Sequence, residues 1–248
     1  MRALFISDLH LEPAREDITE AFLSFCDSIA PDAQQLYILG DFFEAWIGDD
    51  ENTPLQIKIK QSLARLSARG VKIFFMPGNR DFLIGQGFAD ETGITLIPDP
   101  LVVDLNGIPT LLMHGDTLCT DDEEYLAFRA RIRDPKRIKR LLSLPLVIRK
   151  LIARLLRLIS KHRNKNKSIY IMDVTPAAVE QAMCTAGVTR LIHGHTHRPA
   201  IHKVPLPEGR GERIVLGDWH QQGWYGEVLE SGEFRTHTFK FSSQNPPS

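Results

Sequence analysis

Short apolar runs recur along the chain, and several of them end abruptly in polar and glycine-rich residues. The first covers residues 3–6 and is followed by Asp8 and His10, two positions apart. A short apolar run bounded by turn residues is typical of a buried strand. Because the backbone is released from the sheet where a strand ends, we predict that Asp8 and His10 converge there on one point.

Four later stretches have the same form. They are residues 36–41, which end in Asp41; 73–79, which end in Asn79; 111–116, which contain His114; and 191–197, which contain His193, His195 and His197. Helical periodicity separates the first three strands, over residues 17–29 and from Thr53-Pro54 to Gly70. This alternation predicts parallel strands covered by helices, with the polar residues gathered at a shared rim.

The pattern changes after residue 100. Residues 101–105 and 108–113 flank Asn106-Gly107, which predicts a hairpin. A helix is expected from Thr175 to Gly187, a strand over 188–192, and antiparallel strands beyond residue 200. We therefore predict an α/β fold with two sheets, in which residues 1–119 and 168–240 form the core, 120–167 a helical cap, and 241–248 a disordered tail.

The predicted cap has capping signals at Thr120 with Glu123, at Asp134-Pro135, and at Ser143 with Pro145. Its stretch 144–161 has two sides. The basic stripe is Lys150, Arg154, Arg157 and Lys161, and the apolar side is Ile148, Leu151, Ile152, Leu155, Leu158 and Ile159. One alternative is a helix docked on the core with a solvated basic face. The other is an interfacial helix whose apolar side meets acyl chains while its cations face anionic lipid.

Charge is unevenly distributed although the formal net charge is only −1. Residues 129–167 hold fifteen of the thirty basic residues and a single acid, Asp134. A local basic element on an acidic body predicts an anionic surface or ligand. We predict a cytosolic chain that can still touch a membrane. The three cysteines are scattered, no signal-peptide pattern is present, and no apolar window reaches about 18 residues.

The polar residues at the strand ends form a set of metal donors. They are Asp8, His10, Asp41, Asn79, His114, His195 and His197. Imidazoles with two carboxylates and an amide suit Mn²⁺, Zn²⁺ or Fe²⁺, and the lack of thiolates argues against a structural zinc site. Seven ligands suffice for two ions if Asp41 bridges them. Any one motif alone would be a turn or a structural histidine, but five in order after apolar runs favour a metal centre.

The order Asp-x-His, Gly-Asp, Gly-Asn, His and Gly-His-x-His resembles the calcineurin-like metallophosphoesterases. The resemblance implies two mixed sheets packed together with helices outside. It also implies one ion on Asp8, His10, Asp41 and His197, and another on Asp41, Asn79, His114 and His195. His193, which precedes Gly194, is expected to orient a ligand without binding metal.

Arg80 departs from that superfamily, in which a histidine usually follows Gly-Asn and protonates the leaving group. A permanently charged guanidinium cannot supply that proton. It can grip a phosphate and neutralise developing charge. The leaving group is therefore expected to need no proton, as holds for a phosphate that leaves from a pyrophosphate.

Longer strings around Asp41, Asn79 and His114 resemble the UDP-2,3-diacylglucosamine diphosphatases of lipid A synthesis. This resemblance implies two Mn²⁺ ions, water attack on the α-phosphorus, and a peripheral position at the cytoplasmic side of the inner membrane, without nucleic acid or an obligate protein partner. It implies catalytic roles for Asp41, Asn79, Arg80 and His195, and substrate contacts from Asn79, Arg80, Asp122, Ser160, Asn164, Lys167 and His195.

Two other functions remain open from the sequence. A related phosphodiesterase could act on a nucleotide or nucleic acid through the basic cap, although leucine and isoleucine there fit lipid better than base stacking. A non-catalytic scaffold could have kept the fold for protein contacts. Its signature would be lost ligands, and all seven are present.

Overall fold

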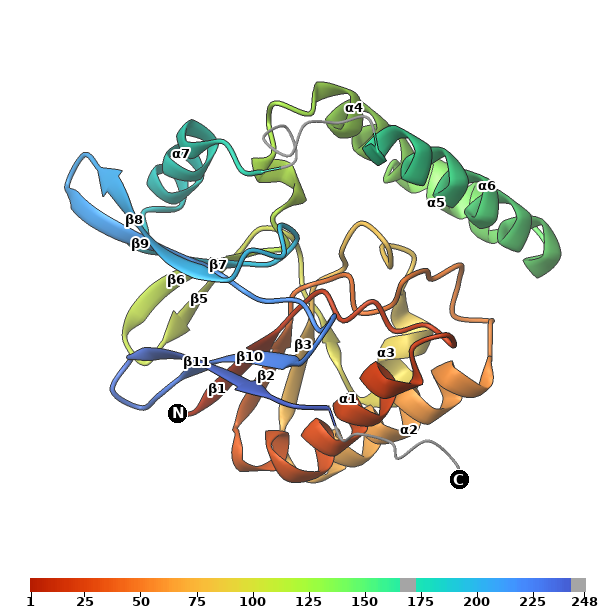
Figure 1. Cartoon of the computed structure of the whole chain (residues 1–248), viewed down its shortest axis with the longest axis horizontal. Coiled ribbons are helices and arrows are strands. Elements are labelled where there is room, and N and C mark those ends of the chain that lie inside the picture. The colour runs from red at the N-terminus through yellow and green to blue at the C-terminus, as the bar shows by residue number, and fades with distance from the viewer. Residues whose placement is uncertain (166–172, 242–248) are drawn as a thin grey trace.

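The computed structural model describes residues 1–165 and 173–241 and contains two mixed β-sheets (Figure 1). The six-stranded sheet has the order β11 (Phe234–Phe239), β10 (Gly223–Val228), β1 (Ala3–Ile6), β2 (Gln35–Ile38), β3 (Lys72–Phe75), β4 (Thr95–Leu96). The five-stranded sheet has the order β5 (Leu101–Leu105), β6 (Ile108–Met113), β7 (Arg190–His193), β9 (Gly209–Val215), β8 (Ala200–Leu206). Both combine parallel and antiparallel pairs, which confirms the predicted fold class.

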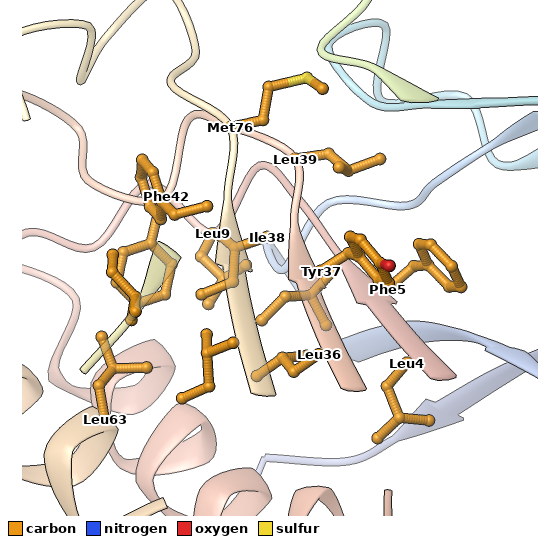
Figure 2. Close-up of a cluster of buried hydrophobic side chains, with 14 of the residues drawn as sticks. Leu4, Phe5, Leu9, Leu36, Tyr37, Ile38, Leu39, Phe42, Leu63 and Met76 are labelled. Atoms are coloured by element: carbon orange, nitrogen blue, oxygen red, sulfur yellow. The ribbon is translucent and has the colours of Figure 1, made fainter. Parts of the chain in front are cut away.

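The centre of the first sheet is buried on both faces, as expected for parallel strands between two layers. All four residues of β1 are buried, and β1 and β2 pair in parallel with Ile6 opposite Ile38. Figure 2 shows the side chains of these strands inside the cluster, with Tyr37 beside Phe5. Those two rings stack with centroids 5.0 Å apart. The packing fixes where β1 and β2 end, and therefore where the polar residues after them begin.

Helices α1 (Glu16–Ser28), α2 (Pro54–Ala68) and α3 (Gln86–Thr92) lie beside the six-stranded sheet (Figure 1). The predicted start of α2 is confirmed, because Thr53 and Gln56 form a reciprocal capping box. The sequence prediction omitted α3 and β4, which have only seven and two residues. Short 3₁₀ turns occupy Ala30–Asp32 and Asp116–Leu118.

The second sheet begins with the predicted hairpin. Leu105 pairs with Ile108, and Asn106 and Gly107 between them both have positive φ, at 57° and 85°. Helix α7 (Pro176–Ala186) ends at Gly187 in a left-handed conformation, as predicted. Strand β7 lies in parallel between β6 and β9, so the carboxyl ends of all three strands lie at one edge.

Three helices follow β6 and lie at the upper right of Figure 1, above the loops on the upper side of the six-stranded sheet. They are α4 (Glu123–Ile132), α5 (Pro135–Leu142) and α6 (Leu146–Lys165). The predicted caps are partly wrong: Asp122 caps α4 by accepting from the backbone N–H of Tyr125, because its carboxylate directly precedes the helix. Thr120 instead donates to Thr175. The cap at Asp134 is confirmed.

The start proposed at Ser143 is also wrong, because α5 ends there and the Ser143 hydroxyl donates to the carbonyl of Arg140. Within residues 1–165 and 173–241, no helix is long and apolar enough to cross a membrane. The division into core and cap stays a prediction. The predicted tail beyond residue 241 lies outside the described residues.

Candidate metal centre

The turns after the strands place their donor side chains through an unusual backbone conformation. Asp8, His10, Asp41, His195 and His197 all have positive φ, between 49° and 68°. A non-glycine residue rarely adopts this conformation, and it persists only where surrounding structure enforces it. Among the described residues, the one other non-glycine case lies in the tight hairpin turn of the second sheet. Five such residues at one edge indicate that the fold holds these side chains in place at a cost.

Two groups of donors result. Asp8, His10 and His197 form the first, with the Nε2 atoms of the histidines 3.3 Å apart and His197 Nε2 3.4 Å from Asp8 Oδ1. Asp41, His114 and His195 form the second, with His114 Nε2 3.7 Å from Asp41 Oδ1. Within each group, one ligand atom from every residue lies within 4.8 Å of the others.

The structure places Asn79 beside the second group, where its Oδ1 lies 3.0 Å from His114 Nε2. The two groups are joined through the backbone, because the N–H of His195 donates to Asp8 Oδ2 at 2.8 Å. All seven donors predicted from the sequence are thus gathered at one edge of the two sheets. Whether Asp41 bridges two ions stays a prediction.

Three histidines are oriented by partners on their second ring nitrogen. Glu44 Oε2 lies 2.9 Å from His10 Nδ1, Asp218 Oδ2 lies 3.1 Å from His197 Nδ1, and the carbonyl of Leu39 lies 2.8 Å from His114 Nδ1. Such partners fix the tautomer so that Nε2 is free to bind metal. In each case the remaining nitrogen is the one that faces the group.

The donor groups fit divalent transition metals. Asp8 Oδ1 is buried without a hydrogen bond in the described residues, although burying an unsatisfied carboxylate oxygen is costly. A cation at the first group would satisfy it. The mixture of imidazole nitrogens with carboxylate and amide oxygens suits Mn²⁺, Fe²⁺ or Zn²⁺ better than Ca²⁺.

Comparison with known proteins bears on what such a centre does. The calcineurin-like phosphoesterase family matches residues 1–199. The chain belongs to this family. A UDP-2,3-diacylglucosamine hydrolase of Hahella chejuensis is 51% identical over 232 residues, covering 94% of this chain and 95% of that protein. Another, of Marinobacter nauticus, is 54% identical over 231 residues, covering 93% and 95%.

A third such hydrolase, from Pseudomonas aeruginosa, is 53% identical and covers 94% of this chain and 97% of its own. Among solved structures, an archaeal phosphodiesterase has a TM-score of 0.48 and 13% identity, covering 96% of this chain and 100% of that one. The family match over residues 1–199 confirms the resemblance to calcineurin-like phosphoesterases, and the three hydrolases extend the similarity over nearly the whole chain.

Arg80, which replaces the histidine usual in this superfamily, lies next to Asp41. The backbone N–H of Arg80 donates to Asp41 Oδ1 at 2.8 Å, and its guanidinium is partly exposed beside the metal centre. Asp81 is fully buried and accepts from the N–H groups of Phe42 and Gly78, which ties the turn after β2 to the turn after β3. Burial and the charge of Asp41 raise the pKa of Asp81 to about 6.

The histidines of the centre differ in pKa, even within the second group. Burial opposes the charged form of His197, but the carboxylates of Asp218 and Asp8 raise its pKa to about 10. Burial likewise opposes a proton on His114, but Asp41 and other nearby carboxylates raise its pKa to about 9. Burial and the charge of His114 lower the pKa of His195 to about 4.

We expect metal affinity to rise with pH as a consequence. Because the pKa values of His114 and His197 are raised, the metal-free chain carries these protons at neutral pH, and a metal must displace them. Titration of the chelated protein with Mn²⁺ should show tighter binding at pH 8 than at pH 6. Calorimetry in buffers of different ionisation enthalpy should show proton release. An affinity independent of pH would contradict this.

Neither donor group found among the described residues includes His193. It is fully buried, and its Nδ1 lies 2.8 Å from the carbonyl of Gly194. Burial lowers its pKa to about 3, which keeps it neutral. It therefore supports the backbone just before His195.

Only some of the predicted substrate contacts of the cap fall on described residues. Asp122 caps α4, and its role toward a substrate stays a prediction. Ser160 and Asn164 belong to α6, but their side chains, and Lys167 altogether, lie outside the described residues. Tyr125, in the first turn of α4, stacks on His195 with ring centroids 6.4 Å apart, and its hydroxyl donates to Asp116.

Two contributors were missed from the sequence, Glu44 and Asp218. Asp218 follows the apolar residues Ile214 to Leu216 and Gly217, so it carries the same signal as Asp41. That signal was overlooked because the region was predicted as antiparallel, whereas β9 pairs in parallel with β7. Glu44 lies in a loop with several acids, and nothing in the sequence distinguishes it from its neighbours.

Proposed function

We propose that the chain hydrolyses the pyrophosphate bond of UDP-2,3-diacylglucosamine, giving UMP and 2,3-diacylglucosamine 1-phosphate for lipid A biosynthesis. The observation that carries the proposal is the combination of two complete donor groups with relatives of that name at about half identity over 94% of the chain. A scaffold that had lost catalysis would be expected to lack some of the donors.

In the proposed centre, Asp8, His10, Asp41 and His197 hold one Mn²⁺, and Asp41, Asn79, His114 and His195 hold the other. When bound, such ions supply Lewis acidity at the phosphoryl oxygens and a nucleophile from water at neutral pH. Glu44 and Asp218 keep the Nε2 atoms of His10 and His197 turned toward the first donor group. His195 of the second group and Asn79 beside it also contact the substrate.

Arg80 grips the phosphate that leaves with the lipid. Its backbone N–H donates to Asp41 Oδ1, and its partly exposed guanidinium lies 3.7 Å from Glu44 Oε1, where a phosphate can reach it. It stabilises the negative charge that develops on the leaving group and transfers no proton. Water therefore attacks the α-phosphorus, and the bond to the lipid-bearing phosphate breaks.

The apolar side of α6 supports a lipid substrate and a peripheral place at the inner membrane. Val147, Leu151, Leu155 and Leu158 are 78%, 67%, 57% and 67% exposed. Exposed apolar side chains this close together on one helix mark a surface for an apolar partner. We propose that this surface meets the acyl chains and the lipid surface that supplies them.

The docking of α6 overturns one of the two alternatives drawn from the sequence. The helix does not dock through its apolar side with a solvated basic face. Instead, Arg149 bonds Asp50 and the carbonyl of Ile47, and Lys150 lies 2.9 Å from Glu51. Lys150 and Arg157 of the basic stripe lie 2.9 Å from Glu51 and 3.0 Å from Glu44, and contact of the stripe with anionic lipid stays a prediction.

Product analysis tests the proposal. The Mn²⁺-loaded protein with UDP-2,3-diacylglucosamine should release UMP and 2,3-diacylglucosamine 1-phosphate, identified by mass. Rigorous chelation should abolish the release, and Mn²⁺ should restore it. Hydrolysis of nucleotides or nucleic acid without activity on the glycolipid would support the alternative phosphodiesterase function.

A further inference from the structure

The side chain of Glu44, in the loop after β2, meets groups from three separate parts of the chain. Its Oε2 lies 2.9 Å from His10 Nδ1. Its Oε1 lies 3.0 Å from Arg157 Nη2 of α6 and 3.7 Å from Arg80 Nη1. The side chain is only 14% exposed, so these charges are poorly screened by water. One oxygen thus faces the metal centre, and the other faces two arginines.

The backbone around Glu44 is fixed between two of the loops that build the centre. The N–H of Glu44 donates to the carbonyl of Leu11 at 3.1 Å, next to a bridge between Leu11 and Phe43. The N–H of Trp46 donates to the carbonyl of Arg80 at 3.2 Å. The carboxylate therefore projects from a clamped segment, and its position does not depend on α6.

Resting on the proposed function, we propose that Glu44 is a positioning residue that couples the docking of α6 to the metal centre. Through one oxygen it turns His10 toward the first donor group. Through the other it holds Arg80 and, at the same time, seats Arg157 of α6 against the loop after β2. The centre and the lipid-facing helix are then aligned by the same carboxylate.

The two carboxylate oxygens of Glu44 make the role specific. Oε2 meets the imidazole of His10, and Oε1 meets the guanidinium groups of Arg157 and Arg80. An ionised carboxylate offers acceptors on both oxygens. Glutamine has the same shape but one acceptor, and its NH₂ group would face a donor, either His10 Nδ1–H or the arginines.

The chain offers two matched controls at the same contact between α6 and the core. Glu12 Oε2 lies 3.2 Å from Arg157 Nη2, and Glu51 Oε1 lies 2.9 Å from Lys150. Replacing either by glutamine removes one ion pair of α6. Neither replacement removes the carboxylate that holds His10 Nδ1, which belongs to Glu44.

Metal binding is the first arm of the test and needs no substrate. Titration of the chelated full-length protein with Mn²⁺ should show that Glu44→Gln weakens binding about 10- to 100-fold at one of two sites, as for other partners of ligating histidines. Glu12→Gln and Glu51→Gln should leave both affinities unchanged. Unchanged affinity in Glu44→Gln would overturn the proposal.

A double-mutant cycle between Glu44 and Arg157 is the second arm. Arg157→Gln should lower kcat/KM several-fold in the native chain but have little effect in Glu44→Gln, because the shared contact is already lost. Glu44→Asp, which keeps the charge but withdraws it by one methylene, provides a second version of the cycle.

The proposal would be refuted if the losses of kcat/KM in the two single variants simply added in the double variant. It would also be refuted if the same cycle between Arg157 and Glu12 gave an equal coupling, because the contact would then be only an ion pair. A native chain that binds Mn²⁺ but does not hydrolyse UDP-2,3-diacylglucosamine would refute the proposed function instead. The metal titration would still decide the role of Glu44 at His10.

Discussion

Asp41→Ala should abolish hydrolysis of UDP-2,3-diacylglucosamine. Asp41 belongs to the second donor group, accepts the backbone bond from Arg80, and is the proposed bridge between two ions. Its loss should lower kcat by more than about 100-fold, which is the upper range for residues that only support a ligand. Mn²⁺ bound per chain, measured on the same preparation by elemental analysis, should fall below two.

Two companions make this result interpretable. Asp41→Asn keeps the shape and an oxygen that can accept from Arg80, so a loss of metal there reflects the missing charge and not a disturbed turn. Asp218→Asn removes only the partner of His197 and should lower activity about 10- to 100-fold. Full activity of the Asp41→Ala variant would contradict the proposal of a two-ion centre.

Replacing Leu151 and Leu155 by aspartate should raise KM for the diacylated substrate by about 10-fold or more and leave a short-chain analogue unaffected. Burying a leucine against an apolar partner contributes about 1.5–3 kcal/mol, and both side chains are exposed and so available to acyl chains. Because neither packs in the core, the melting temperature and metal content should stay unchanged. Steady-state kinetics with the two substrates measure the difference.

Val102→Asp with Ile201→Asp is the matched control. Val102 on β5 is 46% exposed and Ile201 on β8 is 51% exposed. Replacing them removes comparably exposed apolar surface at a distance from α6. The control should leave both KM values unchanged. An equal rise in KM for both substrates, or the same effect from the control, would show that the exposed side of α6 binds no lipid.

The sequence was a good guide to what precedes each donor and a poor one to what surrounds it. Asp41 and His114 follow buried runs whose period and turn residues are local properties, so their positions at strand ends could be predicted. The partners that orient histidines come from distant segments, as Glu44 at His10 and Asp218 at His197 do. Those pairs exist only once the two sheets are assembled.

The orientation of α6 could not be predicted for a similar reason. Its periodicity defines an apolar side around Leu151 and a basic side around Lys150, but it does not say which side docks. The answer depends on Asp50, Glu51 and Glu44, which the loop after β2 gathers beneath the helix. Exposed ion pairs contribute little individually, so a set of them and the buried Arg149 are needed to hold the helix with its leucines outward.

The short elements α3 and β4 illustrate a limit of periodicity. Seven and two residues are too few for a repeat to emerge, and tertiary contacts create them. Helix α3 is held at its start by Asp49, which accepts from the N–H of Gly85 and of Phe88. That carboxylate is remote in sequence, so the helix has no local start signal of its own.

Hydrolysis in water enriched in ¹⁸O tests the central claim most directly. The account predicts that the label enters UMP and is absent from 2,3-diacylglucosamine 1-phosphate, because water attacks the α-phosphorus while Arg80 stabilises the departing lipid phosphate. Mass spectrometry of the two products from a single incubation distinguishes the outcomes. Label in the lipid phosphate would show attack at the other phosphorus and would contradict the proposed role of Arg80.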